Sequence, residues 1–108
     1  MRMDEYQAAA RQTAIYGERF KGVYPALGLA SEAGEVAGKV KKVLRDQEGE
    51  FDPSSIEAIA DELGDVLWYV AVLASDLGLS LDKIASENLG KLRSRQARGR
   101  LSGEGDRR

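Results

Sequence analysis

The chain has 108 residues, a formal net charge of -2, and neither His nor Cys. One domain fits this length, and the near-neutral charge argues against a protein that coats a nucleic acid polymer. The two missing residue types exclude disulfides, thiolate or imidazole catalysis, and metal sites built from Cys or His. Any bound metal is therefore expected to be a hard cation held by oxygen atoms, such as Mg²⁺, with Mn²⁺ as a possible substitute.

Acidic and basic residues are separated along the chain. Residues 46–82 contain ten acidic side chains and neither Lys nor Arg, whereas residues 83–108 contain eight basic and three acidic side chains. Like charges repel within each segment, so this separation favours segments that fold against each other or an acidic segment that binds cations. The longest apolar run, residues 66–74, is too short to cross a bilayer, and the first twelve residues lack the apolar core of a signal peptide. We therefore expect a cytoplasmic protein with no membrane partner.

Abundant Ala and the spacing of the apolar residues predict an all-α fold. Four helices are expected, over residues 3–16, 25–44, 53–77 and 80–97. The first should end at Gly17, and the third should begin at a capping box, Ser54-x-x-Glu57. Gly78 is the expected end of the third helix, and Ser80 should cap the fourth.

We expect these helices to form an antiparallel, four-helix bundle-like domain over residues 1–97, followed by a mobile Gly- and Arg-rich tail over residues 98–108. Within residues 66–74 the third helix is apolar nearly all round. A helix of that kind is buried on more than one side, and four short helices cannot easily cover it alone. Trp68 and Val72 are therefore expected to lie in the interface of a homo-oligomer.

Two pairs of carboxylates lie on the second and third helices, Glu32 with Glu35 and Glu62 with Asp65. The spacing of three residues places each pair on one helix face, and at about 100° per residue both pairs border the apolar stripe. Among these four side chains only Glu35 has a basic neighbour, Lys39, within one helical turn. If the two helices pack together, the carboxylates converge, and a cation is needed to offset their repulsion. The pattern thus predicts a Mg²⁺ site.

The order Glu32-x-x-Glu35, 26 residues, then Glu62-x-x-Asp65 resembles the ExxE…ExxD signature of the MazG-like, all-α nucleoside triphosphate pyrophosphohydrolases. The flanking segments GLASEAGEVAGKVKK and ADELGDVLWYVAVLA are similar to that family as well. The resemblance implies hydrolysis between the α and β phosphates of a nucleotide, in the service of nucleotide pool sanitation. It also implies that the four carboxylates are catalytic Mg²⁺ ligands and that the protein assembles as a dimer or tetramer.

The fourth helix resembles the family pattern Asn-x-x-Lys-Leu-x-x-Arg at Asn88, Lys91 and Arg95. This resemblance implies that Lys91 and Arg95 bind phosphates. Helical rotation places Asn88 and Arg95 near the core-facing edge, where a polar Asn needs partners in the substrate or in the bundle.

Two further residues are candidates for substrate binding. Tyr69 lies one turn beyond Asp65, where it can hydrogen-bond a phosphate, stack on the base, or simply fill the edge of the core. Lys39 can orient Glu35, contact a phosphate, or form a surface ion pair.

Two alternatives stay open. The first is a sister activity, either specific for dUTP or dCTP or acting on phosphoribosyl-ATP. The second is a non-catalytic helical dimerisation module whose acidic patch meets a basic partner.

Overall fold

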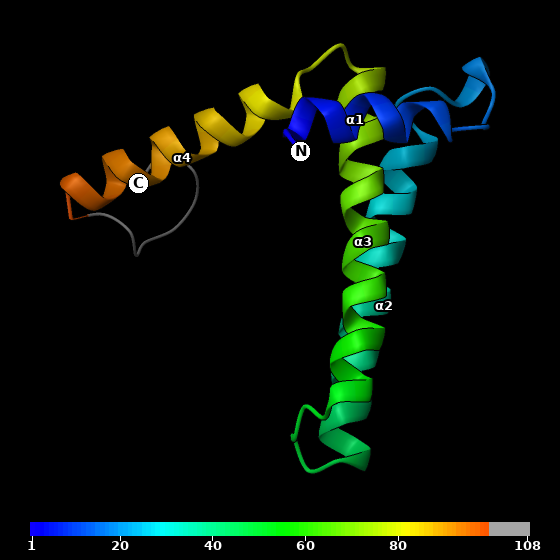
Figure 1. Cartoon of the computed structure of the whole chain (residues 1–108), viewed down its shortest axis with the longest axis vertical. Coiled ribbons are helices and arrows are strands. Elements are labelled where there is room, and N and C mark those ends of the chain that lie inside the picture. Colours follow the sequence, from blue (N-terminus) through cyan, green and yellow to red (C-terminus); the bar gives the residue numbers. More distant parts are fainter. Residues whose placement is uncertain (100–108) are drawn as a thin grey trace.

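The computed structural model describes residues 1–99, and within them every regular element is helical (Figure 1). In chain order the elements are α1 (Met3–Gln12), the 3₁₀ turn η1 (Glu18–Phe20), α2 (Tyr24–Asp46), α3 (Pro53–Asp76) and α4 (Leu81–Ala97). These residues contain no strand, so the predicted all-α class with four helices is confirmed. The expected mobile tail lies outside the described residues from residue 100 onward.

The two longest helices, α2 and α3, pack side by side as an antiparallel hairpin (Figure 1). Each carries a proline in its first turn, Pro25 and Pro53, where the missing N–H costs no helical hydrogen bond. The connecting loop reverses at Glu48 and Gly49, whose φ angles are 54° and 79°. A loop this short makes consecutive helices antiparallel neighbours.

The capping box expected at the start of α3 is wrong. Asp52 is the N-cap, and its carboxylate accepts a hydrogen bond of 2.8 Å from the backbone N–H of Ser55. Asp followed by Pro53 is a stronger start signal than Ser54, because Pro is favoured in the first turn directly after the cap. At the other end Gly78 stops the helix with a φ of +72°, as predicted.

The first helix is shorter than expected and crosses the hairpin near the C-terminal end of α3 (Figure 1). Ala10 of α1 packs with Ala71 and Val72 of α3, and both α3 residues have an exposed fraction of 0%. Trp68 is half-buried, and its indole N–H donates a hydrogen bond of 2.8 Å to the Thr13 hydroxyl. The expectation that Val72 faces a partner subunit is therefore wrong, because α1 covers this side of α3.

The fourth helix does not join a bundle, so the expected four-helix packing is corrected. The axes of α3 and α4 meet at 106°, and α4 packs chiefly on α1 (Figure 1). The side chain of Gln7 holds this junction: it donates to the Leu79 carbonyl at 2.8 Å and accepts from the Leu81 N–H at 3.0 Å. The left-handed backbone at Gly78 and the extended backbone at Ser80 direct α4 away from the α2–α3 hairpin. As predicted, Ser80 caps α4, and its side chain accepts a hydrogen bond from a backbone N–H of the first turn.

Apolar side chains remain exposed on α3 and α4. Ile56 and Leu63 of α3 keep 54% and 53% of their surface exposed, and Ile84 and Leu92 of α4 keep 37% and 36%. Among the described residues no single helix is long and apolar enough to cross a membrane; only the bent pair of α3 and α4 together reaches that length and composition. A single chain does not show the expected oligomer.

Candidate metal centre

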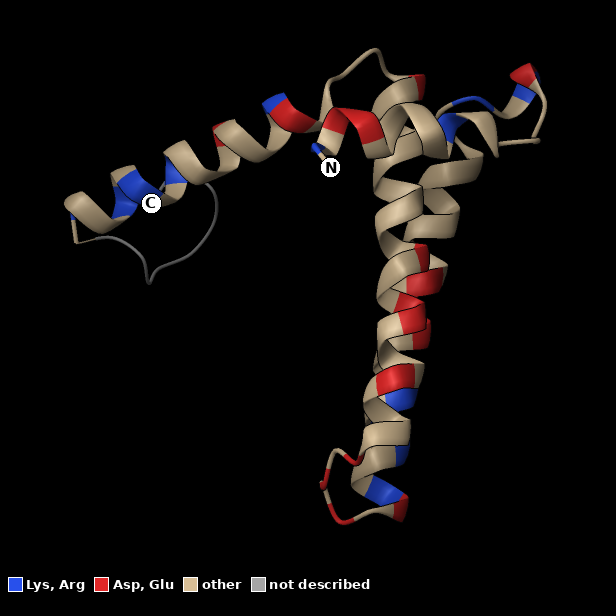
Figure 2. Cartoon of the chain, viewed as in Figure 1, with Lys and Arg blue, Asp and Glu red and all other residues tan. Residues whose placement is uncertain are grey.

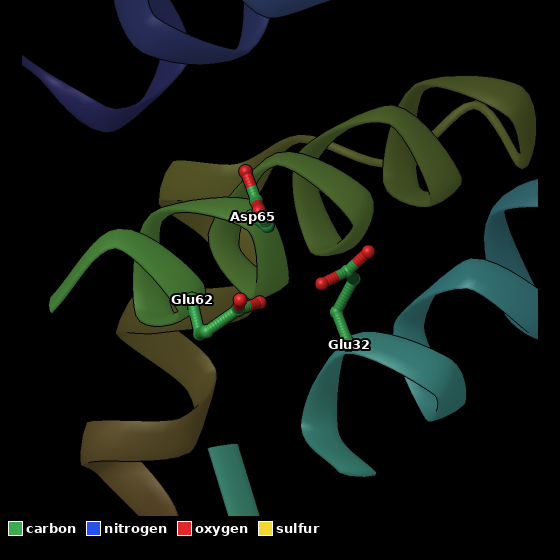
Figure 3. A group of neighbouring side chains, drawn as sticks. All are labelled: Glu32, Glu62 and Asp65. Atoms are coloured by element: carbon green, nitrogen blue, oxygen red, sulfur yellow. The ribbon is translucent and has the colours of Figure 1, made fainter. Parts of the chain in front are cut away.

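Three of the four predicted carboxylates point toward one another midway along the hairpin (Figure 3). Glu32 comes from α2, and Glu62 and Asp65 come from α3. One carboxylate oxygen from each lies within 4.8 Å of the other two. Ligands on opposite sides of a Mg²⁺ or Ca²⁺ ion lie about 4–5 Å apart, so this spacing is compatible with three ligands of one hard cation. Figure 2 shows the cluster as a band of acidic residues across both helices.

The electrostatics of this cluster also suit a cation. A hydrogen bond with the Glu62 carboxyl group raises the pKa of Glu32, and partial burial and the charges of Glu62, Asp65 and Glu35 add to this effect. The Oε2 atom of Glu62 is buried and has no hydrogen-bond partner among the described residues. Leaving such an acceptor unsatisfied costs about 1–3 kcal/mol, and more for a charged group. A hard divalent cation would satisfy this oxygen and relieve the repulsion, so the donor set fits Mg²⁺.

Glu35 and Lys39 are arranged differently from the prediction. Glu35 is exposed and is not among the three converging carboxylates, although it lies close enough to raise the pKa of Glu32. The ammonium of Lys39 lies 3.5 Å from Oε1 of Glu62, on the neighbouring helix. Among the roles left open for Lys39, the contact with Glu35 considered only the turn within α2, whereas helix packing brings Glu62 within reach. Lys39 therefore contacts the acidic cluster through Glu62.

Tyr69 lies beside the carboxylates, as its position after Asp65 predicted. Its ring packs so closely on Gly28 of α2 that a Cβ atom there would overlap the ring. Burial, a hydrogen bond with the Tyr24 hydroxyl, and the nearby negative charges of Glu32 and Asp65 raise the pKa of Tyr69. Only glycine at position 28 allows this ring to lie beside the acidic cluster.

Tyr69 belongs to an aromatic cluster that sequence reasoning missed, formed by Tyr16, Tyr24, Trp68 and Tyr69. The rings of Tyr16 and Tyr24 stack with centroids 5.0 Å apart, and Trp68 meets Tyr69 edge-on, also at 5.0 Å. The three residues from α2 and α3 place the cluster between the carboxylates and the end of the hairpin that α1 crosses.

Asp76 fixes the loop that carries Tyr16. Its Oδ2 atom accepts hydrogen bonds from the Tyr16 hydroxyl at 2.7 Å and from the Gly22 N–H at 2.9 Å. Burial and this contact raise the pKa of Tyr16 to about 12. The position of Asp76 could have predicted this contact from the sequence. It is a single acid at the end of an otherwise apolar stretch of α3, and a buried acid requires hydrogen-bond partners.

The three residues of α4 that were predicted to bind substrate do not reach the carboxylates within one chain. Asn88 and Lys91 are exposed on α4, where they line an open hollow of about 550 Å³, and Arg95 is buried farther along. Figure 2 shows the basic residues of α4 well away from the acidic band. The expected core-edge position of Asn88 is therefore wrong in the single chain, because α4 leaves the hairpin instead of packing along it.

Comparison with known proteins agrees with this geometry. A family model, the MazG nucleotide pyrophosphohydrolase domain, matches residues 25–99, which include the three converging carboxylates and α4. The Gene 37 protein of Mycobacterium phage L5 is 46% identical over 114 aligned positions that cover 100% of both chains. No solved structure shows significant similarity to the chain. With the family model covering well over half of its length, this chain belongs to the MazG nucleotide pyrophosphohydrolase family.

Proposed function

We propose that this protein is a Mg²⁺-dependent nucleoside triphosphate pyrophosphohydrolase that removes unwanted nucleotides from the cytoplasmic pool. The observation that carries the proposal is the convergence of Glu32, Glu62 and Asp65, together with the buried Oε2 atom of Glu62 that has no hydrogen-bond partner among the described residues. In the reaction, a water oxygen bonds to the α phosphorus and the bond from that phosphorus to the α–β bridging oxygen breaks. The products are a nucleoside monophosphate and pyrophosphate.

The residues divide this work between them. Glu32, Glu62 and Asp65 would hold the cation, and Glu35 at the exposed rim would add a fourth carboxylate or accept the proton that the attacking water releases. When bound, Mg²⁺ neutralises phosphate charge and makes water more acidic. Lys39 holds the Glu62 carboxylate in place through their ion pair.

The phosphate-binding half of the site is proposed to come from a second copy of the chain. A triphosphate carries about four negative charges, and its binding calls for basic groups in addition to metal ions. Asn88 and Lys91 are exposed on one face of α4 together with apolar Ile84 and Leu92, and Arg95 lies buried on the same face. Burying this face against the exposed apolar residues of a neighbouring hairpin would bring the basic side chains to that neighbour's carboxylates. We therefore propose a homo-oligomer, a dimer or a tetramer.

A pyrophosphate-release assay tests the activity. The full chain is incubated with a panel of ribo- and deoxyribonucleoside triphosphates and with phosphoribosyl-ATP, in Mg²⁺, in Mn²⁺ and in EDTA. We expect equal amounts of monophosphate and pyrophosphate, with no turnover in EDTA. Turnover confined to dUTP, dCTP or phosphoribosyl-ATP would identify the corresponding sister activity. Absence of turnover on every nucleotide would contradict the proposal and favour a non-catalytic dimerisation module.

A further inference from the structure

A second cavity lies on the hairpin between the carboxylates and the α2–α3 loop. It has a volume of about 220 Å³ and is bounded by both helices. We call it the lysine pocket; its polar lining comprises Lys39, Lys42, Asp46, Gln47, Ser54 and Ser55. This volume corresponds to about seven water molecules at ~30 Å³ each, which is enough room for two linked phosphoryl groups.

The charge of the lysine pocket favours an anion. Asp46 is the one acidic residue in its lining, and both of its carboxylate oxygens accept hydrogen bonds from Arg45, at 2.7 and 2.9 Å. Lys42 forms no salt bridge with any described residue, although its charge helps to lower the pKa of Asp46. The lining therefore carries two ammonium groups and one carboxylate, and Arg45 already pairs that carboxylate.

The neutral lining residues supply further donors. The Ser55 hydroxyl donates to the Gln47 side-chain oxygen at 2.8 Å, which leaves the Gln47 amide group as a donor. With the Ser54 hydroxyl and the two ammonium groups, the lining presents several donors to one small space. An anion with many oxygens, such as a polyphosphate, matches this arrangement.

The lysine pocket adjoins the metal centre through a shared residue. Lys39 lines the pocket, and its ammonium also lies 3.5 Å from Glu62 in the acidic cluster. On the far side of the carboxylates lies Tyr69 with the aromatic cluster. Along the hairpin the surface thus changes from aromatic, through acidic, to basic, and Figure 2 shows the acidic band followed by basic residues, with acidic residues again at the loop itself.

A nucleoside triphosphate has the same order of groups, with an aromatic base at one end and phosphates at the other. We propose that the lysine pocket binds the terminal phosphates of the nucleotide, and the pyrophosphate after cleavage, so that the base points toward the aromatic cluster. This assignment rests on the proposed hydrolase function. It gives Lys42, Ser54 and Gln47 a role in holding the leaving group, separate from the residues of α4.

Direct binding of inorganic pyrophosphate tests the pocket without any turnover. Isothermal titration of the full chain in EDTA excludes metal-mediated binding. Lys42→Ala should raise the dissociation constant at least about tenfold, since a charge-assisted hydrogen bond contributes about 1.5–3 kcal/mol. The matched control is Lys41→Ala, an adjacent exposed lysine outside the lining, which should change the constant less than about twofold. Equal effects of the two substitutions, or no binding by the wild type, would contradict the proposal that the lysine pocket binds pyrophosphate.

Kinetics in Mg²⁺ separate the pocket from the proposed function. Lys42→Ala should raise both the KM for the triphosphate and the inhibition constant of pyrophosphate, whereas Lys41→Ala should leave both unchanged. Turnover with neither constant altered by Lys42→Ala would overturn the pocket and leave the hydrolase intact. A wild-type chain that binds pyrophosphate through Lys42 but hydrolyses no nucleotide would overturn the function and retain the anion site.

Discussion

The α2–α3 hairpin and α4 differ in how much of their surroundings one chain provides. The hairpin brings carboxylates from two helices to within 4.8 Å of one another and has α1 packed across one end. α4 is anchored near its start through Gln7, and its middle exposes Asn88 and Lys91. The carboxylates of the proposed cation site therefore converge within one chain, whereas the proposed phosphate-binding residues of α4 would need a second surface to meet them.

The largest expected effect concerns the hairpin side of this comparison. Glu62→Gln should lower turnover more than about 100-fold, because it weakens a direct ligand, and losses at outer residues alone reach about 10–100-fold. Without metal the variant should unfold no more easily than the wild type, since relief of the repulsion with Glu32 offsets the loss of the ion pair with Lys39. Steady-state kinetics and thermal unfolding in EDTA measure the two effects.

The control for Glu62→Gln is Glu57→Gln, which neutralises an exposed acid on the same helix outside the cluster. It should leave turnover within about twofold of the wild type. Near-normal turnover by Glu62→Gln would show that the carboxylate cluster is not the catalytic metal centre.

The α4 side of the comparison can be tested by mixing two inactive variants. Glu62→Gln removes a proposed cation ligand from the hairpin, and Lys91→Ala removes a proposed phosphate-binding group from α4. If each site combines the hairpin of one copy with α4 of another, a mixed dimer contains one intact site and one doubly damaged site. Random mixing of equal amounts should then restore about a quarter of wild-type turnover in a two-fold dimer.

Recovery should depend on oligomer formation. Ile84→Glu, on the apolar face of α4, should lower the mass seen in sedimentation and abolish recovery, whereas Ser86→Glu on the opposite face should do neither. If the mixture recovers no activity while each variant still forms oligomers, each chain must use its own α4 or none at all.

The hairpin could be predicted from the sequence because its information is local. Helical periodicity fixes which side chains share a face, and the short loop before Asp52 makes the two helices antiparallel neighbours. The convergence of Glu32 with Glu62 follows from these two facts. The ion pair between Lys39 and Glu62 does not, because it depends on the rotation of each helix about its axis after packing.

The placement of α1 and α4 could not be predicted, since it depends on a few residues between helices. The left-handed backbone at Gly78 helps to set the direction of α4, and the apolar pattern within α3 or α4 does not specify that angle. The burial of Val72 likewise depends on where α1 crosses α3, and the apolar pattern of α3 alone does not specify that position. The apolar region was identified correctly, but its covering element was not.

A smaller effect should distinguish two glycines on α2. Gly28→Ala would place a methyl group where the Tyr69 ring lies, so the ring must move. We expect a loss of about 1–3 kcal/mol in unfolding free energy and a higher KM, because Tyr69 borders the metal centre. Gly38→Ala has no atom within 4 Å of its new Cβ and should stabilise the helix by about 0.5–1 kcal/mol. Equal effects at the two positions would show that the ring does not depend on Gly28.

The smallest effect concerns Asp76, which fastens the end of the hairpin to the loop before α2. Although desolvation opposes it, the hydrogen bonds from Tyr16 and Gly22 lower the pKa of Asp76 below its ordinary value of 3.8. The folded state therefore gains stability from the ionised form at pH above that value and loses this contribution as the pH falls through the folded pKa. Asp76→Asn should cost about 1 kcal/mol near pH 7, and the cost should fade as the pH falls through the lowered pKa of the folded state. Tyr16→Phe removes one of the two donors and should show about half of this dependence.

Urea unfolding of the wild type and the two variants, from pH 7 into the acid range, measures the difference. If the cost of Asp76→Asn does not vary with pH, the carboxylate charge contributes nothing and the hairpin end is held by packing alone.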